Sequence, residues 1–214
     1  MVDAQQDVEE QPGRVVPKTK RGARTRAALV TAAREVFERD GFLDARVADI
    51  SKTAGMASGS FYTYFDSKEE IFAEVVRRMR EEMLHPHIRE RAGICDPCEL
   101  IAAANLEYLK SYRRNARLMA VLEQVSNIDE QFRTLRYERA TVIFERNATM
   151  IRTLQETGLA DAELNAWVTA QALSSMMSRM AYLVFVEGQK IAFDTLVETL
   201  NRIWFNALGL ERTP

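Results

Sequence analysis

Residues 50–72 read ISKTAGMASGSFYTYFDSKEEIF, and this stretch decides the fold that we expect. A short helical pattern stops at Gly55, and a second short helix is predicted over 58–65. Small and hydroxyl-bearing residues crowd this second segment, where a core helix would carry Leu and Ala. A helix, a glycine turn and a helix form the helix-turn-helix arrangement, which lays its second helix in the major groove of DNA.

The second segment has the surface that a groove-reading helix needs. Residues 56–65 include no acidic side chain, and a small residue at 59 lets the backbone approach DNA closely. Hydroxyls and helix N-terminal N–H groups can donate to phosphate oxygens, while Phe61 and Phe65 are predicted to face inward. The alternative is a packed aromatic turn with no partner. The residues to which we assign DNA contacts are Ser58, Gly59, Ser60, Tyr62, Thr63, Tyr64 and Lys68.

Charge is distributed unevenly along the chain. The 214 residues carry a net charge of −2, so a nucleic-acid surface must come from local clustering. Residues 18–26 hold five basic side chains, Arg24 among them, and no acidic one; over 18–68 there are ten Lys/Arg against six Asp/Glu. This asymmetry favours a polyanion partner, although a solvated helix start would look similar, and we add Arg24 to the predicted DNA contacts.

Composition is that of a globular protein, with 47% apolar and 28% charged residues. The acidic residues 1–17 show no periodicity, and we expect a disordered arm there. They also lack the apolar region of a secretory signal, and the longest apolar run, 180–186, is too short to cross a bilayer. We therefore expect a cytoplasmic protein with no membrane partner.

Helical periodicity continues through the rest of the chain, and strand signals are nearly absent. We predict an all-α fold of about nine helices, with a helix-turn-helix domain over 18–67 and a helical ligand-binding and dimerisation domain over 68–214. The further helices are expected at about 68–84, capped by Asp66 or Ser67, and at about 96–114, 116–126, 128–157, 161–187 and 194–208. Glycines at 41, 55, 158, 188 and 209 stand where left-handed caps would end helices.

Residues 24–70 resemble the N-terminal domain of the TetR family of transcriptional regulators. The matching segments are Gly41-Phe42, Arg46 to Ser51, Ala54 to Ala57, Gly59 to Phe65 and Ser67 to Ile71. Arg46 stands where that family usually has a capping, phosphate-contacting Thr, so we add Arg46 to the DNA contacts. Ala57 replaces a capping Ser, and Ser51 replaces a core Ala. The resemblance implies a dimeric regulator, usually a repressor, on a near-palindromic operator, with C-terminal helices that form the dimer and a ligand cavity.

The last two predicted helices are apolar on nearly every side, so each must be covered on every side. In a chain of this size, that pattern predicts a core on one face and a second subunit on the other. The alternative is a monomer with a central helix. The predicted dimer interface consists of Leu183, Val184, Leu200, Ile203, Trp204 and Ala207.

Methionine and aromatic side chains in the C-terminal part predict a flexible apolar pocket, although such stripes are more often plain core. Asn105, Asn147 and Arg179 lie on or beside apolar stripes and can orient a ligand, unless they make internal hydrogen bonds. The other predicted ligand-binding residues are Met119, Leu122, Phe144, Met150, Trp167, Met176 and Met180. We expect an apolar effector such as a fatty acid or an acyl-CoA.

Other chemistry is weakly indicated. Cys95 and Cys98 form a C-x-x-C at a predicted helix start, which favours incidental cysteines over a redox sensor. His85 and His87 are the only histidines, so we predict no metal site, and no cofactor or catalytic residue is expected. The alternatives to a regulator are a helical dimer that binds small molecules or senses redox state without binding DNA, and a helical-bundle enzyme.

Overall fold

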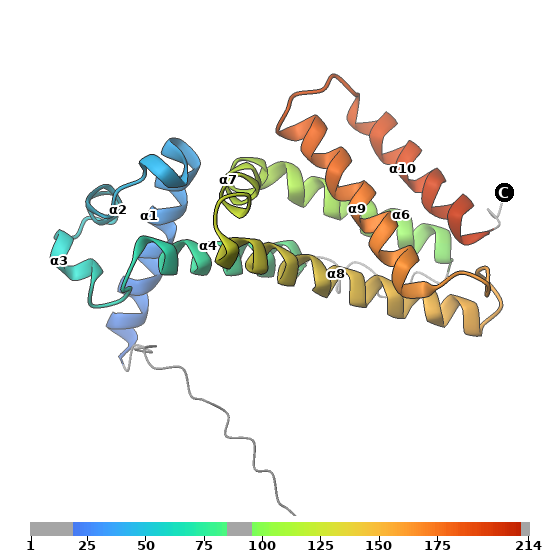
Figure 1. Ribbon diagram of the computed structural model, residues 1–214, viewed down its shortest axis with the longest axis horizontal. Helices are drawn as coiled ribbons and strands as arrows, with labels where there is room; N and C mark the ends of the chain where they lie inside the picture. Colours follow the sequence, from blue (N-terminus) through green and yellow to red (C-terminus); the bar gives the residue numbers. More distant parts are fainter. Residues whose placement is uncertain (1–18, 85–95, 211–214) are drawn as a thin grey trace, which may run out of the picture.

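The computed structural model describes residues 19–84 and 96–210, which form nine helices and no strand (Figure 1). The all-α prediction is confirmed. The helices are α1 (Lys20–Asp44), α2 (Val47–Thr53), α3 (Ser58–Phe61), α4 (Lys68–Leu84), α6 (Pro97–Arg114), α7 (Ala116–Ser126), α8 (Glu130–Glu156), α9 (Ala166–Phe185) and α10 (Phe193–Leu208). The predicted arm 1–17, with His85, His87 and Cys95, lies outside the described residues.

The helices form a head and a body joined by α4. In Figure 1 the head, α1 to α3, lies at one end, and the body, α6 to α10, lies at the other. Helix α4 runs from the head toward the body and packs on α1, α6 and α8. The division predicted at 67/68 thus falls at the start of a helix that contacts both parts.

Polar caps set several helix starts. Ser67 Oγ accepts from the backbone N–H of Glu70 at 3.1 Å, and Glu70 Oε2 accepts from the N–H of Asp66 at 2.6 Å, so two side chains satisfy backbone N–H groups at the start of α4. Asp96 accepts from Cys98 N at 2.8 Å and caps α6, as expected. Asn165 caps α9 through Val168 N at 3.0 Å, which explains why α9 begins later than the predicted residue 161.

The short third helix differs from its prediction over 58–65. It ends at Phe61, and the next three residues form turns in which the N–H groups of Tyr64 and Phe65 still bond to Phe61 O. Phe61 and Phe65 are fully buried, as predicted, and anchor this segment. The five glycines expected at helix ends all have positive φ, which a Cβ would strain. Gly41 differs from its prediction, because it kinks α1 at a ψ of 176° and the helix resumes as far as Asp44.

Phe132, at the start of α8, joins the core of the body to that of the head. Its ring centroid lies 5.1 Å from those of Phe42 and Phe72, at interplanar angles of 70° and 83°. Phe72 in turn packs edge-on against Phe37 at 5.0 Å. Behind Phe132, Ser126 Oγ donates to the Phe132 carbonyl at 3.1 Å and fixes the α7–α8 turn. Head and body therefore share one buried cluster.

A polar bridge runs beside this aromatic cluster. Arg34 of α1 donates to Glu38 and to Glu82 of α4, both at 2.9 Å, and to Asn115 Oδ1 at 2.8 Å. Asn115 is buried at the α6–α7 junction, where its amide donates to Ser111 O at 2.8 Å. One guanidinium thus contacts the head, the joining helix and the body.

Phe132→Ala should lower the free energy of unfolding by about 3–5 kcal/mol, because it opens a cavity between two packed cores. Ile128→Ala, at a 64% exposed side chain just before α8, is the control and should be close to neutral. Urea denaturation of both variants checks the difference. Equal effects would show that Phe132 does not join the two cores.

Candidate nucleic-acid interface and effector cavity

The face over 58–64 combines exposure with rigid support. Tyr62 is 61% exposed and packs edge-on against the buried Phe61 ring at 5.3 Å. Ser58, Gly59 and Thr63 are exposed beside it. Ser60 and Tyr64 are partly buried. The structure brings these predicted contacts onto one segment, and their contact with DNA stays a prediction.

Gly59 is not required by the packing of this chain. A Cβ built at this position meets no atom within 4 Å, and its φ is not positive. Space around Gly59 is therefore open to an outside partner, as expected for a backbone that approaches DNA.

The basic residues of the head divide into exposed and engaged side chains. Arg24 and Arg46 are exposed, and neither forms an ion pair within the described part of the chain. Arg46 precedes α2 without a side-chain capping bond, as its substitution for Thr predicts. Arg26, in contrast, donates to Glu74 of α4 at 2.9 Å and lies 4.7 Å from the Phe65 ring centroid. The two exposed arginines stay candidates for phosphate contact.

Lys68 has a different role from the predicted DNA contact. Its ammonium donates to the carbonyls of Phe42, Leu43 and Ala45 at 2.8, 3.2 and 3.0 Å. It also lies 4.6 Å from the centroid of the Phe42 ring. Three donors thus meet three carbonyls at the end of α1, and an ammonium has no fourth donor for a phosphate. We therefore reassign Lys68 to holding α1, the α1–α2 turn and α4 together.

Glu74 fixes α4 on α1. It is 4% exposed and accepts from Arg26 and from Arg77, whose Nη2 lies at 2.6 Å. Burial alone would raise the pKa of Glu74, but the hydrogen bonds and charges of Arg77 and Arg26 lower it to about 2. The ionised carboxylate therefore stabilises the packing of α4 on the head.

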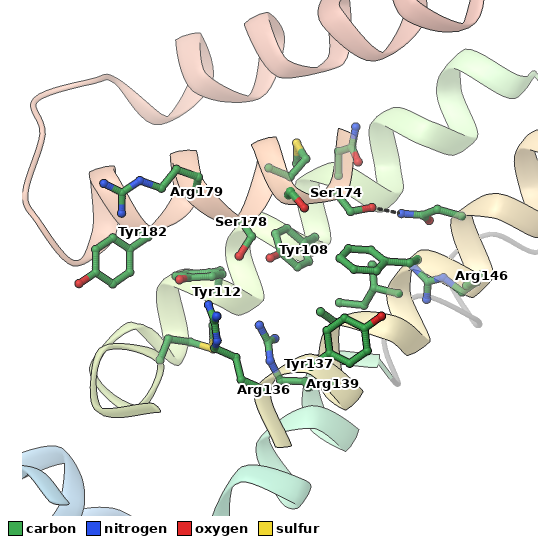
Figure 2. Close-up of a pocket in the computed structure, with 18 of the residues that line it drawn as sticks. Tyr108, Tyr112, Arg136, Tyr137, Arg139, Arg146, Ser174, Ser178, Arg179 and Tyr182 are labelled. Carbon is green, nitrogen blue, oxygen red and sulfur yellow. Dashed lines mark hydrogen bonds between the residues drawn. The ribbon is translucent and has the colours of Figure 1, made fainter. Parts of the chain in front are cut away.

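A cavity of about 560 Å³ lies in the body, and helices α6, α8 and α9 supply most of its wall. Figure 2 shows Arg136 and Arg139 extending from α8 toward Tyr112 and Tyr108 of α6, with Ser174 and Ser178 contributed by α9. Of the predicted ligand-binding residues, five line this cavity: Asn105, Met119, Phe144, Asn147 and Arg179.

The two predicted asparagines also make internal hydrogen bonds. Asn105 Nδ2 donates to Asn201 Oδ1 at 2.9 Å, and Asn147 Nδ2 donates to Ser174 Oγ at 2.9 Å. Arg179 is 62% exposed, pairs with Glu187 at 3.5 Å and stacks on Tyr182. These contacts place the asparagines in the cavity wall and Arg179 at its exposed rim.

The other five predicted ligand-binding residues lie outside the cavity lining. Leu122 is fully buried in the core of α7, and Trp167 packs edge-on against Phe144, behind the wall. Met150, Met176 and Met180 are partly buried against the same core. An apolar stripe has the same appearance in a sequence whether it meets a cavity or another side chain.

Sequence reasoning missed the arginines of α8. Arg133, Arg136, Arg139 and Arg146 line the cavity together with Arg179, against Glu123 as the one lining carboxylate. The four α8 arginines are spaced by three, three and seven residues, which places them on one helix face. The sequence alone could have indicated this shared face. Burial raises the pKa of both Tyr108 and Tyr112, so these phenols stay protonated near neutral pH.

The predicted dimer residues separate into two groups. Leu200 and Trp204 are 3% and 2% exposed and belong to the core of this chain, which corrects their assignment to a partner-facing surface. Ile203 and Ala207 are exposed on α10, and Leu183 and Val184 are partly buried at the end of α9. The amphipathic period of α10 places Trp204 inside and Ile203 outside.

Three observations bear on the predictions about cysteines, metal sites and membrane helices. Cys98 is buried at the start of α6. Within the described ranges, no group of His, Cys, Asp or Glu is arranged to hold a metal ion. No described helix combines the length and apolar character needed to cross a membrane.

Comparison with known proteins places the head within a known family model. Residues 29–75 match the model described as bacterial regulatory proteins, tetR family. The HTH-type transcriptional regulator YdgC of Bacillus subtilis is 25% identical over 195 residues, covering 88% of this chain and 95% of that protein. The HTH-type transcriptional regulator EthR of Mycolicibacterium smegmatis is 23% identical, over 90% and 92% of the two chains.

Among solved structures, the fatty acid degradation regulator FadR from Bacillus halodurans has a similar fold. It superposes with a TM-score of 0.73 at 18% identity, covering 84% of this chain and 94% of that one. A regulator from Syntrophomonas wolfei, described as a putative TetR-family member, gives a TM-score of 0.75 at 15% identity, over 90% and 100% of the two chains. The similarity extends over head and body together.

Lys68→Met should lower the free energy of unfolding by about 2 kcal/mol, because three carbonyls at the end of α1 lose their donor. Lys52→Met, at an exposed lysine of α2, is the control and should be near neutral. Thermal and urea denaturation measure both. Unchanged stability together with weakened DNA binding would return Lys68 to the phosphate contacts.

Glu74→Gln should cost about 2 kcal/mol at neutral pH, and this cost should depend on pH. Because the folded pKa of about 2 lies below the ordinary 4.5, the stabilisation is present above pH 4.5 and is lost as pH falls toward 2. Urea denaturation of wild type and variant across this range measures the difference. A difference that does not shrink on acidification would contradict the role of the ionised carboxylate.

Proposed function

We propose that this chain, a member of the tetR family of bacterial regulatory proteins, is a ligand-responsive DNA-binding transcriptional regulator that acts as a homodimeric repressor. The observation that carries the proposal is the exposed, acid-free face of 58–64, anchored from below by Phe61 and Phe65. DNA phosphates would repel an acidic side chain on this face. Because the face carries none, it can enter a major groove. A role on DNA also implies a cytoplasmic location.

The reading of DNA requires two heads. A two-fold dimer sets two α3 segments in successive major grooves, roughly 34–36 Å apart, on a near-palindromic operator. The exposed Ile203 and Ala207 of α10, with Leu183 and Val184 of α9, are the surface that we assign to the partner subunit. A homodimer interface is usually more apolar than the remaining surface, and this patch agrees with that.

The cavity is the proposed effector site, and α4 is the proposed lever. The effector acts by binding better to one of two dimer shapes, and only one of these holds the heads at groove spacing. Three contacts can carry the difference to the head: Phe132 in the shared aromatic cluster, Arg34 on Asn115, and Arg139 against Met83 of α4. To change the protein from mostly DNA-bound to mostly released, the effector must bind one dimer shape more tightly than the other by several kcal/mol.

A fatty acid or an acyl-CoA is the effector class that we propose. The similar fold of the fatty acid degradation regulator from Bacillus halodurans motivates this ligand class. The cavity volume of about 560 Å³ falls in the usual range for small-molecule sites and supports it.

Selection of random duplex DNA on the purified full-length protein, repeated across salt concentrations, tests the function. A near-palindrome with a steep salt dependence is the expected result. If selection enriches no sequence in the absence or presence of fatty acids and acyl-CoAs, the DNA-reading function fails. The remaining interpretation would then be a helical dimer that binds a small molecule.

Gly59→Leu should leave the free energy of unfolding nearly unchanged, because space around this position is open within the chain. The same substitution should abolish binding to the selected operator, since the leucine side chain meets the groove. Ala162→Leu, at an exposed residue beyond α8, is the matched control and should bind normally. Fluorescence anisotropy with the operator duplex measures both variants. Normal binding by Gly59→Leu would remove residues 58–64 from the interface.

A further inference from the structure

Arg139 is a buried cation without a counterion in the described part of the chain. It is 6% exposed, it lines the cavity, and it forms no ion pair with a described residue. Its hydrogen bond in the described part of the chain is a long one, 3.9 Å, from Nη1 to Met83 Sδ, and the Tyr108 side chain lies across the cavity from it. A guanidinium keeps its charge in proteins, and a buried charge is costly unless an anion balances it.

The tyrosines do not supply that anion. Tyr108 and Tyr112 lie across the cavity from Arg139 and feel its charge, and burial raises the pKa of each. Both are neutral phenols near pH 7 and can solvate the guanidinium without neutralising it. Glu123, the one carboxylate in the lining, is paired with Arg136 at 3.0 Å.

The polar atoms that lack partners in this wall are donors. Arg139 Nε and Trp204 Nε1 are buried atoms of two residues that line the cavity, and neither has an acceptor among the described residues. Arg136 Nε is a third buried donor without an acceptor in the same part of the chain. Buried donors without acceptors carry a desolvation cost, and a ligand that brings acceptor oxygens lowers this cost for each donor that it reaches.

We propose that the effector is an organic anion whose carboxylate or phosphate group binds Arg139, while its apolar body lies against Met119, Phe144 and the tyrosine rings. This inference rests on the proposed function and assigns the residue that binds the anionic group of the effector. Guanidinium groups bind carboxylate and phosphate through paired, charge-assisted hydrogen bonds, which a neutral apolar molecule cannot make. Arg136 and Arg179 are paired with Glu123 and Glu187, so among the lining arginines Arg139 is the buried one with no counterion in the described part of the chain.

The same residue connects the bound anion to the lever. Arg139 Nη1 contacts Met83, which is 3% exposed near the end of α4. An anion that draws the guanidinium into the cavity removes this contact and changes the packing of α4 against α8. Effector binding thereby reaches the helix that joins body and head.

Thermal unfolding of the full-length protein with matched anionic and neutral probes tests the inference. The anions are phenylacetate, decanoate and phenyl phosphate, and the neutral partners are phenylacetamide and decanamide. We expect at least one anion to raise the Tm at millimolar concentration, with its neutral partner inactive. Comparison of the carboxylate probes with phenyl phosphate shows which of the two anionic groups the cavity binds. No stabilisation by any anion, or equal stabilisation by the amides, would overturn the proposal.

Arg139→Met is the decisive variant, with Arg133→Met on the exposed side of the same helix face as its control. Arg139→Met should weaken binding of the active anion by about 10- to 100-fold, and Arg133→Met by much less. Without ligand, Arg139→Met should keep or raise the wild-type Tm, because it removes an unbalanced buried charge. A clear drop in that Tm, or retained anion binding, would assign Arg139 a structural role instead.

Operator binding separates this inference from the proposed function. If neutral molecules alone bind the protein and release its operator, the regulator stands and the anion site fails. If an anion binds through Arg139 while no DNA sequence is selected, the site stands and the regulator fails.

Discussion

The contact on which the structure depends is the ring of Phe132 lodged between Phe42 and Phe72. These rings belong to α8, α1 and α4, so one aromatic cluster is shared by the body, the DNA-reading head and the helix between them. Because a densely packed interior has few voids into which side chains can relax, a movement of one of these helices shifts the helices packed against it. A cavity wall on α8 and an exposed face on the α3 segment are therefore parts of one packed unit.

Buried charges divide the molecule into fixed and adjustable regions. Where α4 meets the head, Glu74 and Lys68 of α4 have their charge or donors fully engaged, and they hold α4 on α1. At the junction, Arg34 meets two carboxylates and a buried amide. In the cavity, Arg139 has no counterion among the described residues. The head is thus built to keep one shape, and the unbalanced charge lies where a ligand can enter.

The fold followed from local chemistry. Glycines with positive φ, polar caps and the inward Phe61 and Phe65 are each readable at single positions, and together they define the head and most helix ends. The face over 58–64 was predictable for the same reason, because its residues lie within seven positions of one another. Local rules failed only at details such as the end of α3 at Phe61.

The cavity and the role of Lys68 were harder to predict from the sequence than the helix ends, because they depend on contacts between distant segments. Lys68 meets carbonyls some 25 residues away in the chain, and its sequence context favoured a phosphate contact equally. Trp167 and Met176 have the same pattern as true lining residues, and only packing separates them. The spacing of the α8 arginines indicates that they share a helix face. A charged helix face is usually exposed to solvent, so the sequence did not indicate that this one lines a cavity.

Native-state hydrogen exchange of the full-length protein tests the central claim, that head and body form one cooperative unit. If Phe132 joins the two cores, the most protected amides of α1 and α4 should exchange through the same opening as those of α8, with matching free energies and denaturant dependence. Head amides that open at a much lower free energy than those of α8 would contradict the claim. The cavity would then have no rigid connection to the face over 58–64.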